Sequence, residues 1–232
     1  MITLLTYPAA LGVFSPSPFC VKARHLLHFA GVEWQREDTL DPRKMPYGKL
    51  PAIRTPSGRI IADSNNIQRW LEQEGTDFQA RLSDRDKAHS LALIRMAEEH
   101  LYFICLLDRW GRDASWPTVR DIYFKEMPQP IRSFIAGGLR KTVLKGMKTQ
   151  GLGRLSDEER LKRAEIDFTA ISNLLWSGGF LFGDAPSLAD LSIGPMLEAC
   201  VSSPVETPLV RRVREDPLLM DYLTRFNAEM GL

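Results

Sequence analysis

The chain has 232 residues, of which 44% are hydrophobic, with 30 basic and 29 acidic side chains. This length can bury one large core or two modest ones, and the charge balance lacks the basic excess typical of nucleic-acid-binding proteins. Three widely spaced cysteines, Cys20, Cys105 and Cys200, do not suit a secreted disulfide scaffold.

The N-terminal residues 1–7 lack the basic start and the long apolar run of a signal peptide. No segment approaches the ~18 apolar residues of a membrane helix. We therefore expect a cytoplasmic protein with neither a membrane nor a nucleic acid as partner. His25 and His28 stand three residues apart without a cysteine or carboxylate in a known ligand pattern, so we expect no metal site.

The first 75 residues predict the element order β-α-β-loop-β-β-α. Proline, glycine and serine positions separate these elements, and the helices show apolar residues at intervals of three and four. The expected strands are 2–7, 32–37, 50–55 and 59–62, and the expected helices begin at Ser17-Pro18 and near Asn65. We predict a thioredoxin-like N-terminal domain over residues 1–76 and a linker over 77–83.

The remainder, residues 84–232, predicts an all-α helical bundle domain, so that the fold class is α+β. A capping-box pattern at Ser83 precedes a long helix that ends near Trp110-Gly111. A second helical region over 119–146 is expected to break at its prolines and at Gly137-Gly138. Capping boxes at Ser156 and Ser187 open two further helices, and residues 209–230 predict one last helix.

The segment Ser17-Pro18-Phe19-Cys20 opens the first helix. A helix N-terminus presents unpaired amides and about half a positive charge, which stabilise an anion such as a thiolate. Serine can donate a hydrogen bond to a ligand's sulfur but cannot exchange disulfides. Two structural readings stand beside this one: Ser17 as a plain N-cap and Cys20 as a buried structural thiol.

Two further segments carry binding chemistry. Pro51 follows Gly48-Lys49-Leu50 at the head of a strand, where a cis peptide bond would leave the preceding backbone free to pair with a peptide. Asp63-Ser64 stands where a strand gives way to a helix, so its amides and hydroxyl suit a carboxylate and its own carboxylate suits an ammonium group. The alternative for this pair is an ordinary helix cap.

Taken in order, three segments resemble the glutathione site of the glutathione S-transferase superfamily: Ser17-Pro18-Phe19-Cys20, residues 44–53 and residues 61–67. The resemblance is closest to the serine/cysteine-type classes, omega-like or metaxin/failed-axon-connections-like. Serine replaces the leading cysteine of omega-like members, and Asp63-Ser64 stands where the family commonly has Glu-Ser. Ser187 and Asp190 resemble the family's folding box in the helical domain.

The resemblance implies a role for each matching residue. Ser17 would hydrogen-bond the glutathione sulfur, with Cys20, Ser15 and Tyr7 as alternates. The tripeptide would be bound by Lys44, Leu50, Pro51, Asp63 and Ser64. The second substrate would lie against the helical domain, where the available aromatic residues are Trp110, Trp116 and Tyr123.

The implied function is a glutathione transferase, in which glutathione is a co-substrate and its activated thiol attacks a small electrophile. A homodimer is the family expectation. Two alternatives remain: a non-catalytic interaction or regulatory protein on the same fold, and a reductase of glutathione mixed disulfides that depends on Cys20.

Overall fold

The computed structural model describes residues 1–175 and 179–231. Its first part contains four short strands and two helices in the predicted order, with a 3-10 turn in the segment that the sequence predicts to be irregular. The elements are β1 (Ile2–Thr6), α1 (Pro18–Phe29), β2 (Trp34–Asp38), η1 (Pro42–Lys44), β3 (Ala52–Arg54), β4 (Ile60–Ala62) and α2 (Ser64–Gln73).

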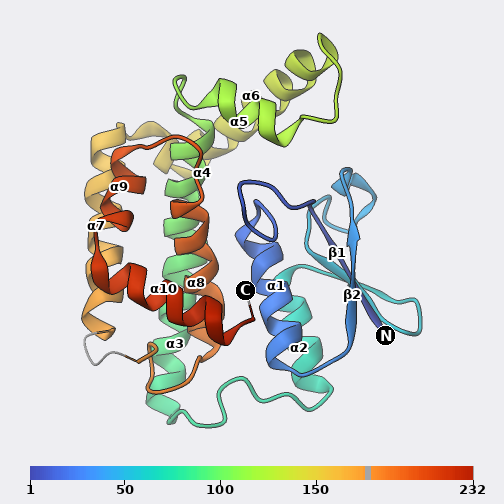
Figure 1. Cartoon of the computed structure of the whole chain (residues 1–232), viewed down its shortest axis with the longest axis vertical. Helices are drawn as coiled ribbons and strands as arrows, with labels where there is room; N and C mark the ends of the chain where they lie inside the picture. Colours follow the sequence, from blue (N-terminus) through green and yellow to red (C-terminus); the bar gives the residue numbers. More distant parts are fainter. Residues whose placement is uncertain (176–178, 232) are drawn as a thin grey trace.

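The four strands form one mixed sheet in the order β2-β1-β3-β4. β1 is parallel to β2 and antiparallel to β3, and every residue of β1 is buried. Figure 1 shows α1 and α2 between this sheet and the helical part, so both helices have a buried side. This arrangement places the loop before α1, the head of β3 and the start of α2 near one another.

The regular elements of the second part are all helices among its described residues. Its elements are α3 (Asp84–Met96), the π-helical segment η2 (Ala97–Leu101), α4 (Tyr102–Trp110), α5 (Trp116–Tyr123), α6 (Ile131–Gln150), η3 (Leu152–Arg154), α7 (Asp157–Leu174), α8 (Leu188–Val201), α9 (Pro208–Arg214) and α10 (Pro217–Glu229). Among residues 1–175 and 179–231, no helix combines the length and apolarity needed to cross a bilayer.

The three helix starts predicted from capping-box patterns in this part, after Ser83, Ser156 and Ser187, are confirmed. Ser83 accepts a hydrogen bond from the amide of Asp86, and Ser156 forms a complete capping box with Glu159. The carboxylate of Asp190 is fully buried and accepts hydrogen bonds from the amide and hydroxyl of Ser187, both at 2.7 Å. These local bonds satisfy amides that a helix leaves unpaired at its first turn.

Two sequence expectations about the helices are wrong. The last helix is split into α9 and α10, because Pro217 lacks an amide proton and starts a new helix capped by Asp216. α6 runs through Gly137-Gly138 without a break, although the prolines at 128 and 130 do separate it from α5. The long first helix of this part also contains the π-helical turn η2, which the pattern did not predict.

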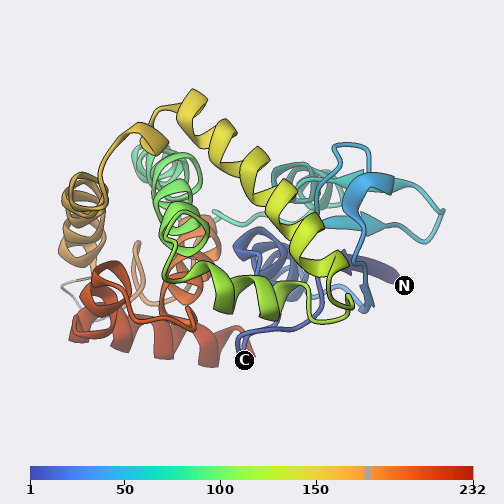
Figure 2. The ribbon, with the colours of Figure 1, turned by 90° about the horizontal axis from the view of Figure 1, so that it is seen from above.

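α5 and α6 form an arm beyond the main bundle. Figures 1 and 2 show the two helices extending from the end of α4 over the end of the sheet domain that carries the loop before α1. In α6 only Ala136 and Met147 are buried, so this helix packs lightly. The arm therefore lies beside the loop before α1 and the helix start at Ser17-Pro18.

Candidate active site

The start of α1 presents a serine hydroxyl that the helix itself does not use. The carbonyl of Ser17 accepts hydrogen bonds from the amides of Cys20 and Val21, at 3.0 and 3.1 Å. Its side chain makes no capping hydrogen bond. The reading of Ser17 as a plain side-chain N-cap therefore does not describe this helix, and its half-buried hydroxyl can serve another group.

Cys20 lies one turn into α1 and is completely buried. Burial raises the pKa of its thiol, while nearby hydrogen-bonding groups of Thr6, Tyr7, Ser17 and Ser15 act in the opposite direction. A buried thiol with a raised pKa has little thiolate at neutral pH, so Cys20 has the character of a structural cysteine. The Ser17 hydroxyl lies beside this thiol.

The two alternates to Ser17 occupy the same neighbourhood. Ser15 is buried and its Oγ accepts a hydrogen bond from the amide of Ser17 at 3.4 Å. Tyr7 follows β1 and packs against a small cluster that includes Cys20 and Leu50. Burial, followed by the nearby Cys20, raises the pKa of Tyr7 to about 12, so its phenol is protonated at neutral pH.

The predicted tripeptide-binding segments meet at the sheet edge beside α1. The Leu50–Pro51 peptide bond is cis, as the family resemblance implies, and Leu50 is buried. The amide of Asp63 donates to the carbonyl of Pro51 at 3.0 Å. This bond joins the head of β3 to the start of α2.

Asp63 is held in an unusual backbone conformation. Its φ is +81°, a left-handed value that non-glycine residues seldom adopt, and such strain is often found at ligand sites. The side chain caps α2 by accepting from the amides of Asn65 (2.9 Å) and Asn66 (3.4 Å). The residue remains exposed and the adjacent Ser64 is buried. The helix-cap reading is thus correct for Asp63, and its carboxylate also stays open to solvent.

Lys44 is exposed at the end of η1, the turn that follows β2. The described residues contain no group of three or more His, Cys, Asp and Glu side chains placed to hold a metal ion. Of the two histidines in α1, His25 is completely buried against the ring of Phe226, with ring centroids 5.1 Å apart.

The three aromatic residues predicted for the second substrate form one cluster. The rings of Trp116 and Tyr123 lie 5.4 and 5.6 Å from that of Trp110. Trp110 is only 7% exposed, whereas Trp116 and Tyr123 are half-buried. The cluster combines the end of α4 with α5, so the arm brings it together.

Arg109 joins this aromatic cluster to the loop before α1. This residue was not among the site residues predicted from the sequence. This buried arginine donates hydrogen bonds to the hydroxyl of Tyr123 at 2.8 Å and to the carbonyl of Pro16 at 3.2 Å. A signal exists: Tyr102, Cys105 and Arg109 are spaced by three and four residues, which puts them on one side of α4. Because arginine is seldom buried, that spacing alone does not assign it to the interior.

Both parts of the chain match models of known protein domains. Residues 18–115 match the glutathione S-transferase N-terminal domain model and residues 158–225 match the C-terminal domain model. A glutathione transferase structure from Phanerochaete chrysosporium superposes with a TM-score of 0.64 at 20% identity, covering 98% of this chain and 96% of that one. A Ceriporiopsis subvermispora transferase, solved in complex with glutathione, gives 0.63 at 18% identity, covering 98% and 97%. These likenesses show the fold.

Curated relatives add sequence similarity. The isoprene-epoxide–glutathione S-transferase of Rhodococcus sp. (strain AD45) is 33% identical over 241 residues, covering 100% of both chains. Mouse metaxin-1 is 30% identical over 169 residues, which cover 70% of this chain and 53% of metaxin-1, so the match spans about half of that protein. With both domain models matched and a full-length relative at this identity, the chain belongs to the glutathione S-transferase family.

Proposed function

We propose that this chain is a glutathione-conjugating transferase. Glutathione would lie along the edge formed by Leu50, Pro51 and Asp63-Ser64, with its sulfur in front of α1. The backbone preceding Pro51 would pair with the cysteinyl part, and Asp63 would hold the ammonium group of the γ-glutamyl end. Lys44 would reach the glycyl carboxylate.

The observation that carries this proposal is the Ser17 hydroxyl, which stands at the N-terminus of a 12-residue helix and makes no capping bond. A hydroxyl in that position can donate to a sulfur anion, and the helix terminus adds favourable electrostatics. Lowering a thiol pKa by one unit requires about 1.4 kcal/mol of differential stabilisation, which one such hydrogen bond can supply.

The structure gives less support to a Cys20-dependent disulfide reductase. That reaction needs a thiolate that can attack a disulfide sulfur. Cys20 is fully buried, and burial raises the pKa of its thiol. The serine in the leading position therefore serves as the thiolate-stabilising group of the proposed reaction.

For the second substrate we infer a small epoxide. The support is the isoprene-epoxide transferase relative, which matches over the full length of both chains at 33% identity. In this chain the half-buried Trp116 and Tyr123 would face such a molecule.

Titration calorimetry with reduced glutathione, followed by a conjugation assay, tests the proposal. We expect binding at millimolar ligand or below and formation of a thioether product. Absence of binding at millimolar glutathione would reject the transferase and favour a non-catalytic protein of the same fold. Binding without conjugation of either an aryl chloride or an epoxide would restrict the function to ligand binding.

A further inference from the structure

One side of α6 carries a cluster of exposed apolar side chains. Ile131, Phe134, Ile135 and Leu139 are 52%, 85%, 42% and 43% exposed, and Phe134 is the most exposed large apolar side chain within the described residues. Intervals of three and four residues put all four on one side of the helix, and we call them the apolar patch of α6. Contiguous exposed apolar surface of this kind marks a site of interaction with a protein or a membrane.

Three lysines extend the apolar patch along α6. Lys141, Lys145 and Lys148 are exposed and lie 7, 11 and 14 residues after Phe134, which keeps them on the same side of the helix. The other basic residues of α6 are two arginines, which form ion pairs with aspartates in or just before α5. Since α6 contains no acidic residue, this side of the helix combines apolar side chains with positive charge alone.

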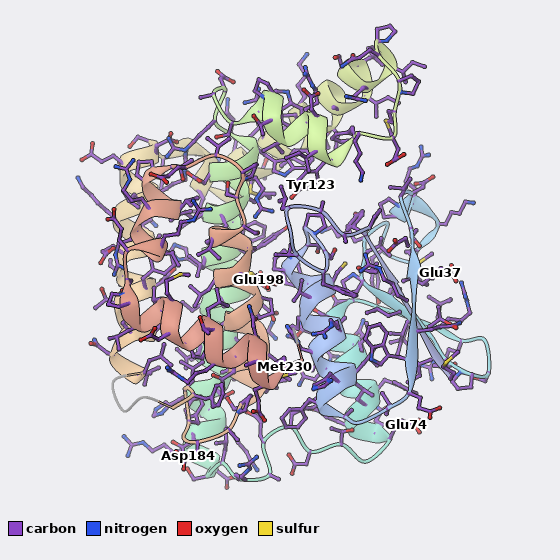
Figure 3. The ribbon with its side chains drawn as sticks, viewed as in Figure 1. Glu37, Glu74, Tyr123, Asp184, Glu198 and Met230 are labelled. Carbon is purple, nitrogen blue, oxygen red and sulfur yellow. The ribbon has the colours of Figure 1, made fainter. Side chains whose placement is uncertain are left out.

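α6 lies on the outside of the molecule. Figure 2, in which the arm faces the viewer, shows this helix in front of the other elements. Figure 3 shows Tyr123 of α5 between the arm and the rest of the chain, whereas many other side chains of the arm extend outward. A flat partner can therefore approach α6 without meeting the two domains first.

The charges of the chain are divided between the arm and the rest. Residues 116–157, which lie between the two segments that match the domain models, have eight basic and three acidic side chains, a net charge of +5. The rest of the chain has 22 basic and 26 acidic side chains, a net charge of −4. An anionic partner is thus attracted to the arm and repelled by the remainder, which orients the approach.

We propose that the apolar patch and the three lysines of α6 form a binding surface for an anionic lipid bilayer. Apolar side chains enter the interface of such a bilayer, and lysines beside them contact its negative headgroups. A nucleic acid would engage the lysines but leave Phe134 in water, and a second copy docked by the same side would bring lysines against lysines. Binding of this kind needs no membrane-spanning helix, so the lack of one in the sequence does not bear on it.

Sedimentation with lipid vesicles tests the proposal, and it needs no glutathione, so its outcome is independent of the transferase reaction. We expect the wild-type chain to bind vesicles of phosphatidylglycerol mixed with phosphatidylcholine, and to bind pure phosphatidylcholine far more weakly. Binding should weaken as sodium chloride is added, because salt screens the lysines.

Two variants with matched controls separate the apolar and charged contributions. Phe134→Ser should weaken binding to the anionic vesicles about 10-fold, whereas Ile166→Ser, at a residue of α7 that is 70% exposed, should not change it. The triple variant Lys141→Gln/Lys145→Gln/Lys148→Gln should weaken it about 100-fold. Its control, Lys162→Gln, changes a lysine that is 72% exposed on α7 and should bind as the wild-type chain does.

Three results would overturn the proposal. The first is a wild-type chain that binds neither vesicle, and the second is equal binding to both. The third is equal loss in the α6 variants and in their α7 controls. If sedimentation equilibrium shows a dimer that Phe134→Ser converts to a monomer, and no vesicle is bound, the surface is instead an interface between two copies of this chain.

Discussion

Lys22 of α1 and Glu98 of the π-helical segment form a completely buried ion pair, with Nζ and Oε1 2.5 Å apart. Asn65 accepts from Lys22 at 2.9 Å and donates to Glu98 at 3.2 Å, and Ser192 of α8 donates to Glu98 at 2.9 Å. The network therefore connects the sheet domain to the helical domain. Because Asn65 follows Asp63-Ser64 directly, the same bonds fix the start of α2.

Replacing one partner of this pair should be costly. Lys22→Met leaves the Glu98 carboxylate buried without its cation, and such changes cost about 3–5 kcal/mol. The free energy of unfolding, measured in urea, should fall by that amount. The double variant Lys22→Met/Glu98→Leu should recover much of the loss because both charges are gone.

The matched control is the exposed pair Lys162–Glu158, whose side chains are 72% and 76% exposed. Lys162→Met should change the unfolding free energy by less than about 1 kcal/mol. If the Lys22 and Lys162 variants lost equal stability, the buried pair would not join the domains as described.

Ser17→Ala should separate thiol activation from binding. Loss of a hydrogen bond to a charged sulfur should raise the pKa of bound glutathione by about one to two units, with affinity nearly unchanged. The ultraviolet absorbance of the thiolate, followed against pH in the complex, measures that shift. Cys20→Ala should keep conjugating activity; the reverse pattern, with activity lost in Cys20→Ala and kept in Ser17→Ala, would favour the mixed-disulfide reductase.

Asp63 caps α2, and its proposed second role is to hold the ammonium group of glutathione; different substitutions can test the two separately. The Asp63→Asn variant keeps a side chain that can cap α2 and tolerates positive φ, but it carries no charge for the glutathione ammonium group. Glutathione affinity should fall about 10- to 100-fold while stability is retained. Asp63→Ala should lose affinity and also about 1 kcal/mol of stability. Calorimetric titration and urea unfolding of both variants give the two readouts, and unchanged affinity in Asp63→Asn would remove this residue from the site.

Locally encoded features were predictable from the sequence. The capping boxes at Ser156 and Ser187 and the turns around α1 and β3 depend on residues a few positions apart, and the structure contains them. The approach of Asp63 to Pro51 followed only from the family resemblance, because a bond between a strand head and a distant helix start has no local signal.

The residues that the sequence reading missed are buried charges. Lys22 lies in the spacing of Phe19, Ala23 and Leu26, so its position on the buried side of α1 was visible, but lysine usually faces solvent. Its partner Glu98 is 76 residues away and lies in a π-helical turn that periodicity did not predict. Leu91 is the opposite case, an apolar residue of α3 that is 54% exposed. Whether the Lys22 and Glu98 side chains are buried depends on contacts between residues far apart in the sequence.

His25 should make the fold sensitive to acid. Burial, with Arg24 and His28 nearby, lowers its pKa from 6.5 to about 3, and its Nε2 has no partner among the described residues. Above pH 6.5 the ring is neutral in both states, so it adds no pH dependence. Below that value the unfolded chain binds a proton that the folded chain does not, so stability falls as the pH drops towards 3. At about pH 5 the His25 ring should lower the free energy of unfolding by about 2 kcal/mol relative to about pH 7.

His25→Leu should reduce the difference in the free energy of urea unfolding between the two pH values, whereas His89→Leu at an exposed position should not. A decline in His25→Leu as steep as that of the wild-type chain would assign the acid sensitivity to other groups.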